Sequence, residues 1–69
     1  MPISGKEAVK ALERNNFTVV NQRGPQVTLY MQAAGDRRMT PAPLHKELKK
    51  GILHGIAKLA RIDIKEFGL

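Results

Sequence analysis

The spacing of hydrophobic residues changes twice along the chain, and these changes limit the folds available to it. Residues 8–12 follow a helical spacing, residues 27–31 alternate apolar with polar side chains, and residues 52–60 return to a helical spacing. A helix repeats every 3.6 residues and a half-buried strand every two. We therefore expect an amphipathic helix near each end, with strands between them.

The first helix has a clear start. Ser4 followed three residues later by Glu7 predicts a capping box, and Ile3 before the cap is placed to pack on Ala8. Asn15 and Asn16 mark the end, because Asn tolerates the left-handed conformation. The expected apolar stripe consists of Ala8, Val9 and Leu12, with Ala11 beside them.

The first two strands are joined by a short turn. Residues 17–22 are rich in β-branched side chains, and Arg23-Gly24-Pro25 is a turn signal. From Val27 to Gln32, apolar and polar residues then alternate strictly. This alternation predicts a strand with one buried face.

A third, shorter strand is expected after a hairpin loop. In residues 33–36, Gly35 can supply the positive φ that a tight turn requires. Residues 37–41 then form the strand. Pro41 and Pro43 prevent it from continuing as a central strand, because proline has no N–H to donate.

The last third of the chain is predicted to be helical from residue 51 to residue 60. Leu48 is placed to pack from the preceding turn, and Asp63 can cap a final helical turn that buries Ile64 and Phe67. The expected apolar stripe of the long helix consists of Ile52, Leu53, Ile56, Leu59 and Ala60.

Together these elements predict an α+β fold in the order α-β-β-β-α with a short C-terminal helix. The simplest arrangement is an antiparallel three-stranded sheet with the helices packed on one face. This is also the element order of double-stranded-RNA-binding domains. We find no repeat or linker, so residues 1–69 are expected to form one domain.

Composition narrows the possible functions. The 69 residues include 12 Lys and Arg against 6 Asp and Glu, a net charge of +6, which favours a polyanion or an acidic protein as partner. The chain has no cysteine, which excludes disulfides, thiolate metal sites and cysteine nucleophiles. We also find no export signal or membrane-spanning run, and we expect a cytoplasmic protein without a cofactor.

The basic residues form separate groups that are candidates for phosphate contact. The alternative is that each group simply keeps a helix face in water. The candidates are Lys6 and Lys10 on the first helix, Arg23 at the turn, and Lys46, Lys49 and Lys50 before the last helix.

Aromatic residues are too few for a base-stacking platform. Phe17 and Phe67 occupy core positions, which leaves Tyr30 alone, so recognition through shape and backbone is favoured. The histidines are His45, in a loop where functional residues concentrate, and His54, on a polar helix face. Neither has the neighbours that a metal site needs.

Several motifs in this order resemble the HicA family, the RNA-cleaving toxins of HicA/HicB toxin–antitoxin pairs. The resemblance runs over nearly the whole chain. It rests on Ser4-Gly5-Lys6-Glu7, Phe17, Arg23-Gly24, Pro43-Leu44-His45, Glu47-Leu48-Lys49-Lys50-Gly51 and the helix from Gly51 to Ala60. It implies a fold like that of double-stranded-RNA-binding domains, a metal-independent mRNA endonuclease, and a HicB-type antitoxin that covers the active site.

The resemblance also implies one catalytic His, at the start of the second strand. In this chain that position holds Gln26, preceded by Pro25 where the family has a small residue. A glycine that is usual after the long helix is also missing, since Ala60-Arg61 stands there. Glutamine can donate a hydrogen bond to phosphate but cannot transfer a proton near neutral pH.

Three explanations of Gln26 remain open. The chain is a deliberately inactivated toxin, a natural member that binds without cutting, or an enzyme in which His45 has taken over proton transfer. Two functions from other classes also fit the composition: a non-catalytic RNA-binding module, and a subunit that binds only an acidic partner protein.

Overall fold

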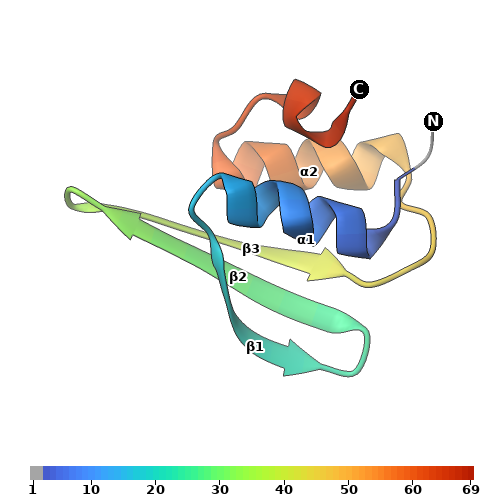
Figure 1. Ribbon diagram of the computed structural model, residues 1–69, viewed down its shortest axis with the longest axis horizontal. Coiled ribbons are helices and arrows are strands. Elements are labelled where there is room, and N and C mark those ends of the chain that lie inside the picture. Colours follow the sequence, from blue (N-terminus) through green and yellow to red (C-terminus); the bar gives the residue numbers. More distant parts are fainter. Residues whose placement is uncertain (1–2) are drawn as a thin grey trace.

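The computed structural model describes residues 3–69 and has the expected order of elements. These are α1 (Gly5–Arg14), β1 (Thr18–Arg23), β2 (Gln26–Ala33), β3 (Asp36–Pro43), α2 (Lys50–Ala60) and the 3₁₀ helix η1 (Ile64–Phe67). The strands form one antiparallel sheet in the order β1-β2-β3, and both helices lie on the same side of it (Figure 1). The predicted α+β fold is therefore confirmed.

Local signals at both ends of α1 act as the sequence predicts. The Ser4 hydroxyl accepts from the Glu7 N–H at 3.2 Å, and the Glu7 carboxylate accepts from the Ser4 N–H at 3.1 Å. This reciprocal capping box satisfies two N–H groups that a helix start leaves without a partner. At the other end Asn16 has a φ of 72°, the left-handed conformation that stops the helix.

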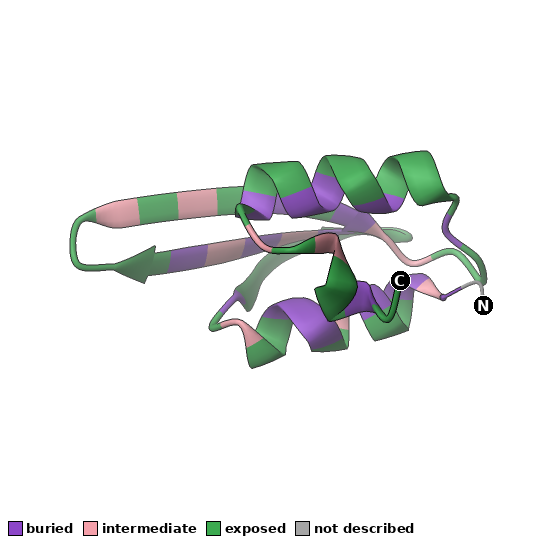
Figure 2. Cartoon of the chain, turned by 90° about the horizontal axis from the view of Figure 1, so that it is seen from above, coloured by how far each residue is buried: buried purple, intermediate pink, exposed green. Residues whose placement is uncertain are grey.

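One hydrophobic core lies between the helices and the sheet. Val27, Leu29 and Met31 of β2 face it, as the alternation predicts, and Phe17 and Phe67 are buried in it. Figure 2 shows the buried stripes of both helices turned inward. Thr40 is the one buried polar residue recorded in the described part of the chain, and its hydroxyl donates to the Pro41 carbonyl.

The apolar stripe expected for α2 is partly wrong. Ile52 and Leu59 are 41% and 54% exposed, whereas Ala57 is buried. The buried residues of α2 are Leu53, Ile56, Ala57 and Ala60. Their spacing of three, one and three residues turns Ile52 and Leu59 to the edges of the stripe, because each residue advances about 100° around a helix.

Strand β3 is longer than predicted, since it reaches Pro43 instead of ending at Pro41. The prolines are tolerated because β3 is an edge strand. The Leu44 N–H bonds to the Pro25 carbonyl, so even-numbered positions here point their N–H groups toward β2. Pro41 and Pro43 therefore lie at positions whose nitrogens point away from the sheet, where no donor is needed.

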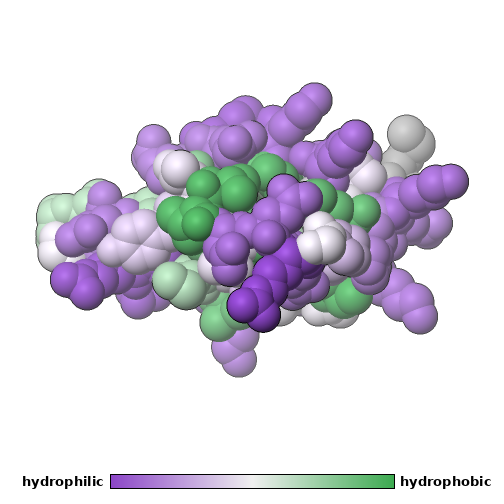
Figure 3. Space-filling view, turned by 90° about the horizontal axis from the view of Figure 1, so that it is seen from below, coloured by the Kyte–Doolittle hydropathy of each residue, from purple (hydrophilic) through white to green (hydrophobic). Residues whose placement is uncertain are grey.

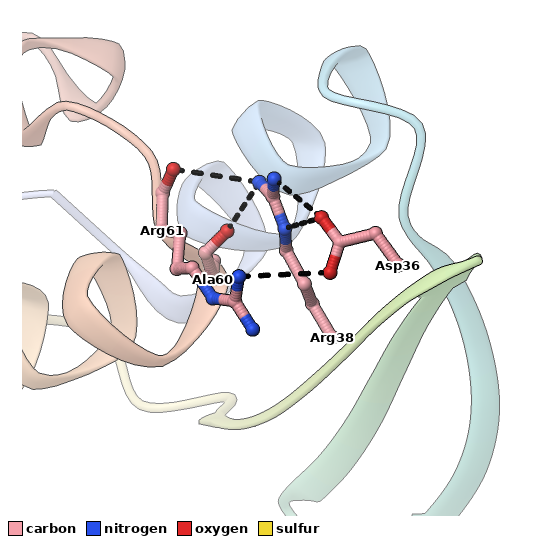
Figure 4. Close-up of polar contacts among 4 residues, drawn as sticks. All are labelled: Asp36, Arg38, Ala60 and Arg61. Atoms are coloured by element: carbon pink, nitrogen blue, oxygen red, sulfur yellow. Dashed lines mark hydrogen bonds and ion pairs between the residues drawn. The ribbon is translucent and has the colours of Figure 1, made fainter. Parts of the chain in front are cut away.

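The start of β3 is joined to the end of α2 by hydrogen bonds and ion pairs of charged side chains (Figure 4). Arg38 bonds to the Asp36 carboxylate at 2.8 and 2.9 Å and donates to the Ala60 carbonyl at 3.0 Å. Arg61 pairs with Asp36 at 3.6 Å and ends the helix with a φ of 55°. The bond from Arg38 is the main cause that lowers the pKa of Asp36 below its usual 3.8.

Between residues 3 and 69, no helix is both long and apolar enough to cross a membrane.

Candidate functional site

Three segments meet at the end of the molecule where β2 begins: the β1–β2 turn, the segment from residue 44 to residue 49, and the start of α1 (Figure 1, right). Backbone hydrogen bonds join them. Leu44 donates to Pro25, Gly5 donates to the His45 carbonyl at 2.8 Å, and Leu48 donates to the Ile3 carbonyl at 2.8 Å. The position of the 44–49 segment is thus fixed from both sides.

Gly5 makes this junction possible because α1 begins almost in contact with the end of β3. A Cβ atom at Gly5 would overlap the Pro43 carbonyl oxygen and lie 2.6 Å from the Leu44 Cα. Both neighbours are backbone atoms where β3 joins the segment that carries His45 and Lys46, so they cannot move away without displacing it.

Gln26 is the first residue of β2 and lies between its cross-strand partners Arg23 and Pro43. The turn before it places Gly24 at a φ of 56°, which a residue without a Cβ adopts readily. Since Val27 faces the core, the alternation along a strand turns Gln26 to the opposite, helix-free side of the sheet. Its side chain is exposed.

The candidate lysines are all exposed, but they do not form one cluster. Lys46 and Lys49 lie on the segment bonded to the β1–β2 turn, and Lys50 begins α2. Lys6 and Lys10 instead line a groove of about 270 Å³ between α1 and β1, on the helix side of the sheet. The structure thus brings Arg23, Lys46 and Lys49 to the end of the molecule that carries Gln26, whereas Lys6, Lys10 and Lys50 line clefts on the helix side.

The histidines occupy different surroundings. His45 is exposed and directly follows Leu44, so its backbone lies beside the turn that leads into Gln26. His54 is exposed on α2 and lines a shallow cleft with Lys50 and Ile64. Within residues 3–69, no group of three or more His, Asp or Glu side chains could hold a metal ion.

Arg37, one of the basic residues that leave the β2–β3 hairpin, also shares the face of Gln26. It pairs with Gln32, which stands three alternate positions after Gln26 on β2. The signal for this placement is the tight hairpin at Ala34 and Gly35, which fixes the register between β2 and β3.

Residues 5–62 match the family model described as the HicA toxin of bacterial toxin–antitoxin systems. The matched segment begins with α1, ends two residues after α2 and includes all the candidate site residues. The chain therefore belongs to the HicA toxin family. It is the toxin component of a toxin–antitoxin system and is expected to pair with an antitoxin. A search of curated proteins finds no match.

Proposed function

We propose that this toxin acts on mRNA and that Gln26 marks the place where an active family member transfers a proton. The observation that carries the proposal is the position of Gln26. It lies exposed at the start of β2, beside Arg23 and close to the loop with Lys46 and Lys49. An anionic backbone reaching Gln26 meets Arg23 on the neighbouring strand and comes near the lysines of the adjoining loop.

The chemistry explains why this one position decides activity. When RNA is cleaved through its 2′-hydroxyl, that oxygen attacks the adjacent phosphorus and loses its proton, while the leaving 5′-oxygen gains one. A histidine can take or give such protons at neutral pH. Gln26 can donate a hydrogen bond to a phosphate oxygen or accept one from a hydroxyl, but it cannot transfer a proton near neutral pH. We therefore expect RNA binding with little or no cleavage.

The same surface supports the proposed partners. A HicB-type antitoxin that covers the end around Gln26 would meet the positive charge of Arg23, Lys46 and Lys49, and an acidic surface would match it. Both the mRNA and the antitoxin place the protein in the cytoplasm, without a small-molecule cofactor or a membrane.

A second candidate is a module that binds RNA or antitoxin but never cuts, and Gln26 itself favours it. His45 offers a third possibility, because its backbone adjoins the same turn. Gln26→His separates the inactive toxin from the module that never cuts, and His45→Gln tests the third possibility.

The test is growth arrest on induced expression. We expect the chain with Gln26 to be harmless and Gln26→His to arrest growth, with relief by a co-expressed HicB-type antitoxin. Gln22→His is the matched control, since Gln22 pairs with the buried Val27 and faces the helix side of the same hairpin. Folded Gln26→His that leaves growth unchanged would overturn the proposed role of position 26.

If the natural chain arrests growth and His45→Gln abolishes the arrest, then His45 is the group that transfers the proton.

A further inference from the structure

The sheet face that carries Gln26 has no helix on it, and its side chains are those of a nucleic-acid surface. Along β2 this face presents Gln26, Thr28, Tyr30 and Gln32, because the residues between them face the core. Residues directly opposite one another share a face. The neighbouring strands therefore add Thr18, Asn21, Arg23, Arg37, Met39, Pro41 and Pro43.

The charge of this face has one sign. It carries two arginines, several amides and hydroxyls, and no carboxylate. The acidic residue nearest in sequence, Asp36, belongs to the opposite side with Arg38, where both contact the end of α2. Figure 3 views the molecule from the helix-free side and shows mainly hydrophilic surface with hydrophobic surface near its middle.

Tyr30 lies at the centre of this face. Its cross-strand neighbours are Thr18 on β1 and Met39 on β3, and Met39 is 55% exposed. The phenol donates to the Gln32 Oε1 at 2.9 Å, which directs the hydroxyl along the strand and holds the ring in place. Gln32 in turn stands opposite Arg37. The Tyr30 ring therefore lies between Arg37, toward the β2–β3 hairpin, and Gln26, at the start of β2.

We propose that single-stranded RNA lies along this helix-free face, with one base stacked on Tyr30 and phosphates near Arg23 and Arg37. The proposal rests on the proposed function, because Gln26 fixes where the RNA backbone passes. Gln26 and Tyr30 are four strand residues apart, about 13 Å. The stacked base therefore belongs to a nucleotide beyond the one at Gln26.

Single strands are favoured over duplexes by the same geometry. Bases inside a duplex are covered by their neighbours, whereas single-stranded bases can turn outward and stack on an aromatic ring. One ring cannot build the multi-aromatic platform of other RNA-binding sheets, but it suffices for one base. The Tyr30 ring, with amides and hydroxyls around it on the face that carries Gln26, favours RNA over a protein as the occupant.

The composition supplies a direct probe, because Tyr30 is the one tyrosine and the chain has no tryptophan. Protein emission excited in the tyrosine band therefore reports on this ring alone. We expect a single-stranded oligoribonucleotide to quench the emission at the same concentrations at which labelled RNA shows binding by anisotropy. A duplex of the same sequence should cause much less quenching.

Two variants test how much stacking on Tyr30 contributes to the affinity for RNA. Tyr30→Phe keeps the ring and should bind single-stranded RNA within about twofold of the natural chain, whereas Tyr30→Val should bind roughly tenfold more weakly. Valine suits a strand, and circular dichroism checks that the fold is kept. Leu59→Val is the control, since Leu59 is exposed on α2, on the other side of the molecule.

The outcomes separate this proposal from the proposed function. RNA that binds without quenching Tyr30, or that binds Tyr30→Val as well as the natural chain, would overturn the stacking and leave the proposed function standing. Equal quenching by the duplex would also overturn it, as would quenching by the antitoxin but not by RNA. No RNA binding by any variant would count against the proposed function itself.

Discussion

Gln26 and the histidine expected at its place have similar size and polarity, so we expect that replacing one by the other keeps the fold. The difference is chemical: the imidazole titrates near neutral pH and the amide does not. Because Gln26 is exposed and its neighbours Arg23 and Pro43 belong to strand termini, a histidine there would meet no steric conflict. Position 26 thus tests chemistry separately from folding.

Gly5 is the residue at which we expect the largest loss of stability from one methyl group. Gly5→Ala forces the new Cβ into the Pro43 carbonyl and the Leu44 backbone, and such overpacking costs about 1–3 kcal/mol. The Cβ of Gly55→Ala meets nothing within 4 Å, so that variant should gain about 0.5–1 kcal/mol from helix propensity. Urea unfolding midpoints of the two variants should therefore shift in opposite directions.

If Gly5→Ala unfolds at the same urea concentration as the natural chain, the close approach of α1 to residues 43–45 is wrong, and with it the geometry of the loop beside Gln26.

In the turn of the β2–β3 hairpin, Ala34 is poorly suited to its backbone conformation. Ala34 and Gly35 have φ values of 49° and 82°, the pair of positive angles that a type I′ turn requires. Alanine tolerates this conformation poorly and asparagine tolerates it well. Ala34→Asn should raise the free energy of unfolding by roughly 0.5–1 kcal/mol. Thermal unfolding measures this gain. Ala33→Asn, one residue earlier in β2, is the control and should show no such gain.

The ion pairs between β3 and the end of α2 should make the stability of the fold depend on pH. The folded pKa of Asp36 is lowered, first by its hydrogen bond from Arg38, so its contribution is complete above the unfolded pKa of 3.8. That contribution is lost as the pH falls through the folded pKa. Asp36→Asn should therefore lose less stability than the natural chain between about pH 6 and about pH 3.

Arg38→Met should weaken this acid dependence in the same way, and combining it with Asp36→Asn should add little further change. Fully additive effects would mean that the pair does not act as a unit in solution.

The elements of the fold follow closely from local sequence signals, and the errors come from tertiary contacts. The capping box and the alternation from Val27 to Met31 each depend on neighbouring residues, and both predictions are confirmed. The exposure of Leu59 depends on which side of α2 meets the sheet, and the length of β3 on its place at the sheet edge. Neither the exposure of Leu59 nor the length of β3 can be predicted from hydrophobic spacing alone.

The candidate site shows the same limit. Sequence motifs select Gln26, His45 and Lys49 separately, but the bond from Leu44 to Pro25 that brings their segments together is a long-range contact. That Gln26, Tyr30 and Arg37 share a face could be read from the strand period and the hairpin register together. The separation of Lys10 from this face could not.

For the molecule as a whole, the net charge of +6 should appear as a salt-dependent affinity for RNA. Each phosphate contact to a single strand contributes a slope of about −0.7 in the logarithmic plot of affinity against salt. Lys46→Gln combined with Lys49→Gln should make the slope shallower by about 1.4. Lys58→Gln combined with Lys65→Gln is the control, because it makes the same change in charge on elements away from Gln26. An equal effect on the slope would mean that RNA follows no preferred path across the protein surface.

The most direct test of the account is the rate at which purified protein cleaves single-stranded RNA, compared between the chain with Gln26 and Gln26→His under single-turnover conditions. A positioned acid–base group contributes about 10²–10⁴ in rate. We expect the histidine variant to cleave faster by a factor in that range, with unchanged RNA affinity and a rate that follows the titration of the imidazole. Equal rates for two folded proteins that bind RNA equally would contradict the role assigned to position 26.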